Sequence, residues 1–463
     1  MSESTLESDY LVIGAGAMGM AFTDSILAES DATVTLIDRY HRPGGHWTRA
    51  YPFVRLHQPS AFYGVNSRTL GSDAIDAAGW NAGLAELATS GEVCAYFDQV
   101  MQQQFLPSGR VRFLPMHEYE GAGRCRSLGG DQVTEVHAQT VVDASYMNVT
   151  VPSMRPPPFP VNDDAHCAAV NAVPEQIGHF DRFVVIGAGK TGMDACLFLL
   201  QHGVEAASIR WVMPRDSWYL NRANIQPGRV GVDAAQRVFM AQSQIFAEAN
   251  SVEALFSGVE ASGQLLRLDR DVEPSMYRCA TVTERELEAL RALRPGIIRK
   301  GRVVALQSSV IELEHGEAPT DTGTLHIDCT ADGLALRPAT PIFAGGQITL
   351  QAIRFCQQVF SAAFIGHVAV SYASDAERNA LCTPIPHPDS ALDYLRVNLA
   401  NTLAMATWAG DPALQAWLKR SRLDGFTQAD VPDPDPSDPA VAAAFTQVAA
   451  SIENLTRLLA EST

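Results

Sequence analysis

Tyr10-Leu-Val-Ile-Gly-Ala-Gly-Ala-Met-Gly19 is the stretch that decides the fold of this chain of 463 residues. A short apolar run, typical of a buried parallel strand, breaks into a Gly-x-Gly-x-x-Gly turn, and a helical stretch follows over about residues 20–29. A second apolar strand at residues 33–37 then ends in Asp38. Strand, glycine turn, helix, strand and terminal acid in this order predict a dinucleotide-binding unit.

The three glycines of this turn have separate tasks. Gly14 allows the tight turn, Gly16 lets the backbone approach a pyrophosphate, and Gly19 lets the helix pack closely on the strand. Unpaired N–H groups at the start of the helix would then bind the pyrophosphate. Asp38 is placed to accept from both ribose hydroxyls of an adenosine, which favours a nucleotide over the alternative of a turn without ligand. The neighbours that we assign to the same site are Ala15, Met18 and Arg39.

The same unit recurs at Phe183-Val-Val-Ile-Gly-Ala-Gly-Lys-Thr-Gly192. Its second strand, at residues 209–213, has no terminal acid and runs into Arg215 and Asp216. Arg215 could pair with a 2′-phosphate, which favours NADPH; in the alternative, Asp216 takes the ribose hydroxyls and Arg215 is a surface charge. Lys190 either holds an NADPH phosphate or is an exposed lysine at the start of a helix. The turn residues assigned to this second site are Gly187, Gly189, Lys190, Thr191 and Gly192.

Composition and charge exclude several classes of protein. The chain has 34 Lys+Arg against 52 Asp+Glu, and the net charge of −18 disfavours nucleic acid and anionic membranes as partners. The first residues resemble no signal peptide and no apolar run is long enough to span a membrane, so we expect a cytoplasmic protein, which could form a homodimer. The eight cysteines include no C-x-x-C pair, and the histidines lack metal-ligand spacing. We therefore expect no metal, no disulfide scaffold and no redox dithiol, and we interpret Cys196 and Cys356 as core residues.

A second repeat indicates how the two units are built. Residues 109–114 are echoed by residues 301–306, and each segment leads to a closing strand, at 140–145 and at 325–330. This pattern predicts an α/β fold of two Rossmann-like domains with inserted β-hairpins. An acid after the first unit and an arginine after the second suggest FAD followed by NADPH.

The domain divisions follow from these units and from the proline-rich connector at residues 151–160. We also expect a helical insertion and a helical C-terminal region, with helices near residues 391–408 and 440–459. The predicted divisions are 1–160 and 325–380 for the FAD-binding domain, 180–324 for the NADPH-binding domain with the helical insertion at about 232–293, and 383–463 for the C-terminal region.

Two such units in one chain resemble the two-dinucleotide-binding flavoproteins, and within them the flavin-containing and Baeyer–Villiger-type monooxygenases, as a distant relative. The resemblance covers roughly residues 8–225 and 325–370, and its most specific motifs are Gly44-Gly45-His46-Trp47 and Tyr51-Pro52. These motifs imply a path beside the flavin, which residues 55–64 would continue; in the alternative, residues 55–64 form an ordinary surface loop. The residues assigned to the flavin are Gly45, His46, Trp47, His57, Gln58, Ser60, Ala144, Gln347 and Thr349, and of these Trp47, His57 and Gln58 are assigned to catalysis.

Two further segments bear on the resemblance. Residues 214–218 are similar to an Arg-Ser and Trp pattern that follows the second glycine motif in these monooxygenases. Residues 341–350 precede an apolar helix, where such proteins place a helix N-terminus under the flavin pyrimidine. The chain departs from the family at Phe159-Pro-Val and His166, where the expected glycine is missing, and over residues 232–293, which match neither subfamily.

The resemblance implies an FAD- and NADPH-dependent monooxygenase that uses a flavin hydroperoxide. One oxygen atom from O2 would enter a small organic substrate at a nitrogen, sulfur or carbonyl centre. One alternative is an NADPH-dependent flavin oxidoreductase or dehydrogenase that transfers no oxygen. Another is a non-catalytic FAD-binding redox sensor, which the second nucleotide unit disfavours because a sensor needs no hydride donor.

Overall fold

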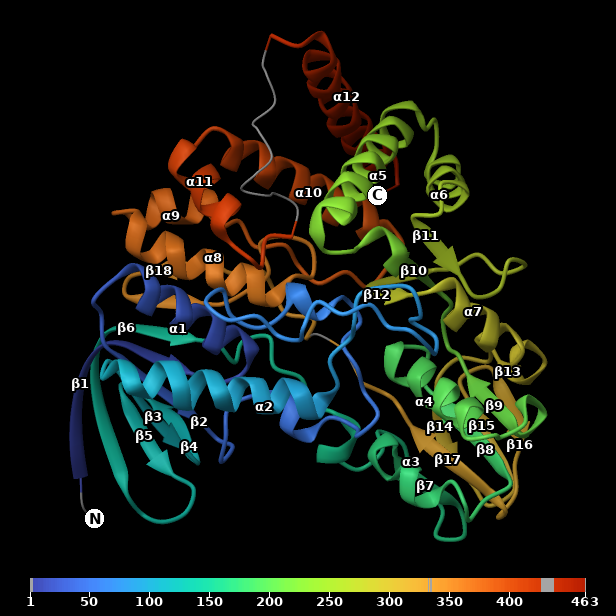
Figure 1. Ribbon diagram of the computed structural model, residues 1–463. Coiled ribbons are helices and arrows are strands. Elements are labelled where there is room, and N and C mark those ends of the chain that lie inside the picture. The colour runs from blue at the N-terminus through green and yellow to red at the C-terminus, as the bar shows by residue number, and fades with distance from the viewer. Residues whose placement is uncertain (1–2, 332, 334, 426–436, 463) are drawn as a thin grey trace.

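A computed structural model describes residues 3–331, 333, 335–425 and 437–462, and it shows two α/β units beside each other and a helical cap (Figure 1). The strands of the first unit are β1 (Glu3–Ile13), β2 (Val34–Asp38), β3 (Val111–Pro115), β4 (His117–Gly121), β5 (Arg124–Ser127), β6 (Val133–Asp143), β18 (Phe343–Ala344) and β19 (Gln347–Thr349). They form one sheet in the order β18-β19-β6-β1-β2-β3, to which the hairpin β4-β5 is joined along β6. Strands β19, β6, β1, β2 and β3 are parallel, as the predicted Rossmann-like fold requires.

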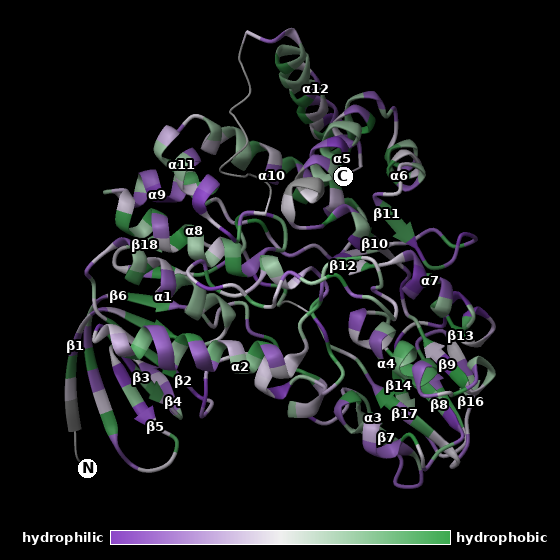
Figure 2. Cartoon of the chain, in the orientation of Figure 1, coloured by the Kyte–Doolittle hydropathy of each residue, from purple (hydrophilic) through white to green (hydrophobic). Residues whose placement is uncertain are grey.

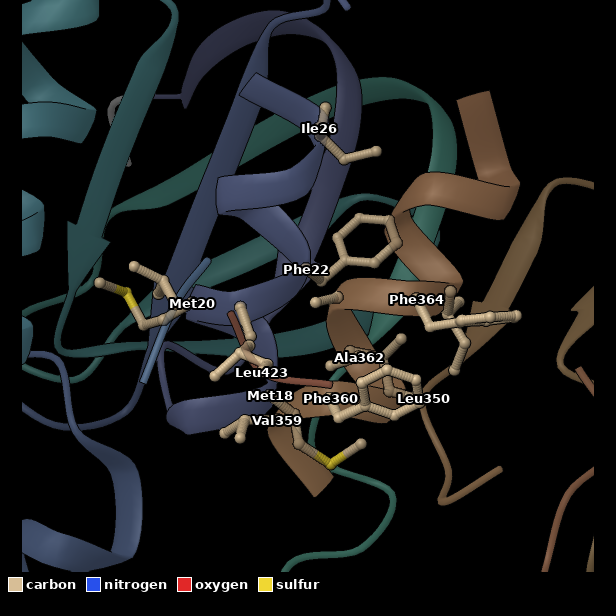
Figure 3. Packing of buried hydrophobic residues seen from close by; sticks show 14 of the residues in the cluster. Met18, Met20, Phe22, Ile26, Leu350, Val359, Phe360, Ala362, Phe364 and Leu423 are labelled. Carbon is tan, nitrogen blue, oxygen red and sulfur yellow. The ribbon is translucent and has the colours of Figure 1, made fainter. Parts of the chain in front are cut away.

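Helix α1 (Ala17–Glu29) follows β1 through the predicted glycine turn. Gly14 has a φ of +106°, and a Cβ on Gly19 would lie 1.9 Å from the Gly14 oxygen, so both positions require glycine. The helix is buried from Met18 to Ile26, and it packs on helix α8 (Gln358–Ser371). Figure 3 shows Met18, near the start of α1, beside Val359, near the start of α8. The N-terminal ends of the two helices therefore lie on the same side of the unit.

The second unit has a parallel sheet in its own right. Its strands are β7 (His166–Ala169), β8 (Arg182–Ile186), β9 (Ile209–Val212), β13 (Ile297–Ile298) and β17 (Thr324–Asp328). They are ordered β13-β9-β8-β17-β7, and helix α4 (Lys190–Gln201) follows β8. Gly187, between β8 and α4, has a φ of +127°, and a Cβ there would lie 2.8 Å from the Cys329 oxygen. The turn is thus built in the same way as the first one.

The sheet pairing corrects one predicted boundary. The sequence pattern places residues 325–328 in the FAD-binding domain, but they belong to β17, which pairs with β7 and β8 of the second unit. The chain returns to the first sheet later, at β18. The reason is that β17 follows the β-structure inserted in the second unit, at residues 303–319, and completes the sheet of that unit.

Both units contain the inserted β-structure that the sequence repeat predicts. The first insertion is the β4-β5 hairpin, and the second is a three-stranded sheet of β14 (Val303–Leu306), β15 (Val310–Leu313) and β16 (Gly316–Pro319). In Figure 2 the end of β6 inside the first sheet is green (hydrophobic), whereas β5 of the hairpin is purple (hydrophilic). The predicted α/β fold with inserted hairpins is confirmed.

The cap is only partly the helical insertion expected from the sequence. It contains α5 (Gly228–Glu248), α6 (Val252–Ala261) and α7 (Glu284–Arg291), but also a three-stranded sheet. The strands of this sheet are β10 (Ser217–Asn221), β11 (Leu265–Arg267) and β12 (Met276–Val282). The prediction of a purely helical segment over residues 232–293 is therefore wrong for β11 and β12, because two short strands pair with β10 from outside the segment.

The C-terminal region is helical where the structure describes it. It contains α10 (Leu392–Ala409), α11 (Pro412–Arg420) and α12 (Pro439–Glu461), close to the predicted helices, while residues 426–436 lie outside the described residues. Helix α12 packs along α5, as Figure 1 shows in red and green. The remaining α-helices are α2 (Ser90–Val100), α3 (Val173–Gln176) and α9 (Asp375–Leu381). Within the described residues, no helix combines the length and the apolar character that a membrane crossing needs.

Candidate active site

A cavity of about 1550 Å³ lies between the two units and the cap. Both predicted glycine turns open into it, the first through Gly14 and Gly16 and the second through Gly189 and Lys190. Residues of α5, β12 and α10 form the wall on the side of the cap. The two predicted nucleotide sites therefore share one space.

Most residues assigned from the sequence meet in this cavity. Those that line it are Gly14, Gly16, Met18, Asp38, Arg39, Gly45, His46, Trp47, His57, Gln58, Ala144, Gly189, Lys190, Thr191 and Gln347. Four others shape the two turns from inside without lining the cavity; they are Ala15, Gly19, Gly187 and Gly192. Three assigned residues lie elsewhere, and each is considered below: Ser60, Arg215 and Thr349.

Asp38 ends β2 as predicted, and its carboxylate fixes the first turn. The side chain is buried, with Oδ2 accepting from the Ala15 N–H and Oδ1 from the Tyr40 N–H, both at 2.7 Å. Burial raises the pKa of Asp38, while these two N–H donors lower it. The carboxylate stands at the cavity wall, and its contact with a ribose remains a prediction.

The Gly-Gly-His-Trp segment packs directly on the first glycine turn. Gly44 N–H donates to the Ala15 oxygen at 2.9 Å, and Gly45 has a φ of +57°. A Cβ on Gly45 would lie 2.9 Å from the Gly16 Cα, so only glycine allows this approach. The segment continues as a 3-10 helix (Gly45–Arg49), in which the Trp47 indole donates to the Tyr63 hydroxyl at 2.6 Å. Trp47 is thereby held as a fixed part of the cavity wall.

His57 lies half-buried in the cavity wall, and a buried arginine holds its backbone. Arg222 is 0% exposed and donates to the His57 oxygen at 2.7 Å and to the Thr281 oxygen at 3.1 Å. The same guanidinium pairs with Glu286 at 3.0 Å. Burial, together with the Lys190 and Arg222 cations, lowers the pKa of His57 to about 3. At neutral pH the imidazole is therefore a neutral donor and acceptor.

We expect the His57 imidazole to stay neutral between about pH 8 and pH 5 in the folded protein, because its pKa of about 3 lies below the ordinary 6.5. The unfolded chain binds the proton first, so the free energy of unfolding should fall as pH drops from 6.5 toward 3. Nitrogen-15 NMR of histidine-labelled protein, assigned with His57→Gln, measures the protonation state. The urea-unfolded chain is the control, and a folded-state titration of His57 near pH 6.5 would contradict its enclosed position.

Two of the assigned flavin residues serve the backbone instead. The Ser60 hydroxyl donates to the Glu86 oxygen at 3.0 Å and accepts from the Ala88 N–H at 2.8 Å. Thr349 belongs to β19, where its N–H donates to the Ile342 oxygen at 2.9 Å. Neither residue lines the cavity. The Ser60 hydroxyl serves backbone groups that would otherwise be unpaired, so the structure gives no support to Ser60 as a flavin contact, and the assignment of Thr349 stays a prediction.

Lys190 lies at the second glycine turn and is not the exposed lysine of the alternative prediction. Its ammonium pairs with Asp194 one turn later in α4, and it lies 3.8 Å from Glu286. Asp194 also accepts from the Tyr51 hydroxyl at 2.7 Å. The lysine therefore stands on the cavity wall inside a network of carboxylates.

Arg215 does not reach the second nucleotide turn. Its guanidinium makes two hydrogen bonds to Asp389, at 2.7 and 3.0 Å, and Arg278 pairs with the same carboxylate. The Arg215 hydrogen bond holds the pKa of Asp389 below its ordinary value. Asp216 is held by Arg299 through bonds of 2.8 and 2.9 Å. Both predicted roles at the ribose are thus unsupported, because each side chain already has an ion partner and neither residue lines the cavity.

The N-terminal end of α8 supplies cavity residues that the sequence reasoning missed. The predicted helix starts only at Gln358, after a connection that brings Arg354 and Gln357 to the cavity. Among the described residues, neither atom of the buried Gln358 amide has a hydrogen-bond partner. Such an orphaned amide beside a cavity is a fitting partner for a polar ligand edge.

A disulfide that no motif announced also lines the cavity. It joins Cys279 of β12 to Cys356, two residues before α8, across a sequence separation of 77. His387 Nδ1 lies 3.7 Å from the Cys356 sulfur. The interpretation of Cys356 as a core residue is therefore wrong, because the connection before α8 turns this side chain toward the cap. No local spacing could have indicated the pair.

Sequence comparisons relate the chain to proteins from mycobacteria. It is 53% identical over 420 residues to the uncharacterized protein Rv2000 of Mycobacterium tuberculosis (strain ATCC 25618 / H37Rv), covering 91% of this chain and 78% of the relative. The uncharacterized protein Mb2023 of Mycobacterium bovis matches with the same identity and coverage. The chain belongs to this protein family. Residues 12–65, which include the first glycine turn, also match the family model of the NAD(P)-binding Rossmann-like domain.

Among solved structures, similar chains include several monooxygenases. Cyclohexanone monooxygenase from Rhodococcus sp. Phi1 bound to NADP+ is 16% identical, with a TM-score of 0.49 and coverage of 81% of this chain and 85% of that chain. Oxidized steroid monooxygenase bound to NADP is 15% identical, with a TM-score of 0.47 and coverage of 98% of both chains. A flavin-containing monooxygenase from Stenotrophomonas maltophilia is 15% identical, with a TM-score of 0.44 and coverage of 82% and 100%.

Proposed function

We propose that the chain is an FAD- and NADPH-dependent monooxygenase that inserts one oxygen atom from O2 into a small organic substrate. One observation carries this proposal: two dinucleotide-type glycine turns, on two separate parallel sheets, open into one cavity. Dinucleotides bind at the carboxyl ends of such strands, with the pyrophosphate at the helix N-terminus. Two cofactors bound in this way would extend toward each other.

The first unit fits FAD. The first turn of α1, at residues 17–20, carries no carboxylate, and the close approach of Gly16 and Gly45 leaves bare backbone at the cavity wall. The orphaned Gln358 amide at the start of α8 would serve the polar edge of the ring. Bound there, FAD would supply hydride acceptance from reduced nicotinamide and the reaction with O2.

Residues of this chain would orient the ring and exclude water. Trp47 is fixed by its bond to Tyr63, and His57 is fixed through its backbone by Arg222. The neutral imidazole of His57 can donate one hydrogen bond without adding a charge to the cavity. The N-terminal end of α8 favours negative charge on the ligand beside it.

The second unit fits the nicotinamide cofactor. Helix α4 begins at Lys190 after Gly189, where a Cβ would meet no atom within 4 Å, so the approach to the helix end is open. Its first turn, Lys-Thr-Gly-Met, has no carboxylate, which suits a pyrophosphate. The Lys190 ammonium, which pairs with Asp194, stands at this helix end and would donate a hydrogen bond to the phosphates.

The cap wall suits a mainly apolar substrate with one polar group. Phe239, Met240 and Met405 line the cavity together with Tyr394 and Asn401. Asn401 is buried, and in the described part of the chain its side-chain oxygen has no hydrogen-bond partner. This oxygen could accept from a substrate N–H or O–H group, which would orient a nitrogen, sulfur or carbonyl centre toward the flavin.

A second candidate function is an NADPH-dependent flavin oxidoreductase that transfers no oxygen. The disulfide on the cavity wall favours it, because a disulfide is a two-electron acceptor that needs no O2.

Anaerobic reduction by NADPH followed by mixing with O2 tests the proposal. We expect the yellow flavin absorbance to bleach with NADPH and to return with O2, with an oxygenated product from an amine, thioether or ketone. Bleaching without such a product would favour the second candidate. A protein that takes up no FAD would end both proposals.

Arg215→Ala should change the KM values for NADPH and NADH by the same factor, to within about threefold, because Arg215 is engaged with Asp389 and does not line the cavity. Steady-state oxidation of each cofactor measures the two KM values. Arg182→Ala, which removes an exposed arginine from its pair with Asp321, is the control for the lost charge. A tenfold rise in the KM for NADPH, without a rise for NADH, would show that Arg215 binds the 2′-phosphate after all.

A further inference from the structure

We propose that Cys279 and Cys356 form a redox-active pair that takes up two electrons from reduced nicotinamide through the flavin of this cavity. This inference rests on the proposed flavin site, and it adds to that site a second electron acceptor built from the chain itself.

The position of the bridge is the first argument. Both half-buried cysteines line the same cavity as the two glycine turns. Cys356 lies two residues before Gln358, at the end of α8 that stands beside the start of α1 (Figure 3). An isoalloxazine ring that extends from the first glycine turn toward Gln358 would therefore come close to the disulfide.

The surroundings of the bridge differ from those of three other cysteines. Cys196, Cys329 and Cys382 are buried in the cores, and burial raises the pKa of each thiol well above its ordinary value. Such thiols are structural and unreactive. The cavity pair instead has His387, whose Nδ1 lies 3.7 Å from the Cys356 sulfur. An imidazole at this distance can deliver the proton that a leaving thiolate takes up.

The backbone at the bridge is strained on both sides. Cys279 has a φ of +56°, and Phe355, the neighbour of Cys356, has a φ of +44°. Non-glycine residues rarely adopt this left-handed conformation, and such strain gathers at functional sites. The bridge also joins the cap strand β12 to the segment before α8, so its opening would remove a covalent link between the cap and the first unit.

The chemistry balances without a further reagent. The S–S bond of Cys279 and Cys356 breaks and takes up two electrons and two protons, which gives two thiols. Reduced nicotinamide supplies the two electrons and one of the protons as hydride, by way of the flavin, and becomes the oxidised nicotinamide. The second proton comes from solvent through His387. Oxidised protein should therefore consume two equivalents of NADPH in the absence of O2, one for the flavin and one for the bridge.

Anaerobic titration of the FAD-loaded protein with NADPH tests this count. We expect complete bleaching of the flavin only after two equivalents in the parent, but after one equivalent in Cys279→Ser/Cys356→Ser. Cys167→Ser, which removes a half-buried thiol outside the cavity, is the matched control and should still need two. A parent protein that is fully bleached by one equivalent would overturn the inference.

Alkylation of the parent protein with N-ethylmaleimide, followed by peptide mass spectrometry, gives a readout independent of the flavin signal and of the variants. Cys279 and Cys356 should be unlabelled before reduction and labelled after two equivalents of NADPH, and NADPH without FAD should leave them unlabelled. A flavin that is reduced while both cysteines stay unlabelled would overturn this inference and leave the proposed function standing. Labelling of both cysteines before any reductant would overturn it too. If the protein bound no FAD but a phosphine reductant opened the bridge, the proposed function would be wrong. The electron path proposed here, which needs the flavin, would then be wrong as well.

Discussion

Arg222→Met is expected to lower the free energy of unfolding by about 3–5 kcal/mol, because it removes one partner from a buried ion pair. The guanidinium of Arg222 is fully buried and pairs with Glu286, which is 6% exposed. It also holds the backbone of the His57 loop to the cap, so one substitution loosens two parts of the cavity wall. Urea unfolding followed by circular dichroism measures the loss.

The matched control for this substitution is Arg182→Met. Arg182 pairs with Asp321 at 2.8 Å, but the two side chains are 59% and 47% exposed. Exposed pairs of this kind contribute less than about 1 kcal/mol. If Arg222→Met cost no more than the control, the buried arginine would not anchor the loop as described.

Gly45→Ala is expected to weaken FAD binding by about 100-fold, or about 2.7 kcal/mol. The added Cβ would lie 2.9 Å from the Gly16 Cα, so the Gly-Gly-His-Trp segment has to move away from the glycine turn that would bind the pyrophosphate. Fluorescence titration of the FAD-free protein with FAD measures the dissociation constant.

Gly109→Ala separates this effect from simple backbone strain. Gly109 has a φ of +69°, close to that of Gly45, but a Cβ there would meet no atom within 4 Å. Both variants place an alanine in the left-handed conformation and bear that cost in stability, whereas only Gly45→Ala should lose FAD. Equal FAD affinity in the two variants would remove the Gly-Gly-His-Trp segment from the flavin site.

The sequence predicts those parts of the molecule in which the residues of a motif contact residues close to them in the chain. The first turn, its helix and the acid at the end of β2 lie within residues 10–38, and each residue type is required by local geometry, as Gly19 against the Gly14 oxygen shows. The second turn follows the same local rules. For this reason two short motifs were sufficient to indicate both glycine turns and the two α/β units that carry them.

The parts that could not be predicted depend on partners distant in the chain. Arg215 has the chemistry of a phosphate ligand, but Asp389, 174 residues later, engages it. Ser60 has the hydroxyl of a flavin contact, but the backbone near Glu86 uses it. The strands β11 and β12 gain their strand character from pairing with β10. No local pattern carries such information, because each residue type suits either role equally well.

The order of strands in the first sheet also has a consequence for how the chain matures during synthesis. All five strands of the second parallel sheet lie between residues 166 and 328, whereas the first sheet is completed only by β18 and β19, up to Thr349. The unit that a ribosome begins first is therefore the one that it finishes second. The end of β6 that β19 later pairs, at residues 141–143, stays unpaired on that side while the whole of its neighbour emerges. An unpaired strand edge is a site at which nascent chains associate. The cap is later still, since α5 obtains its partner α12 only near residue 461.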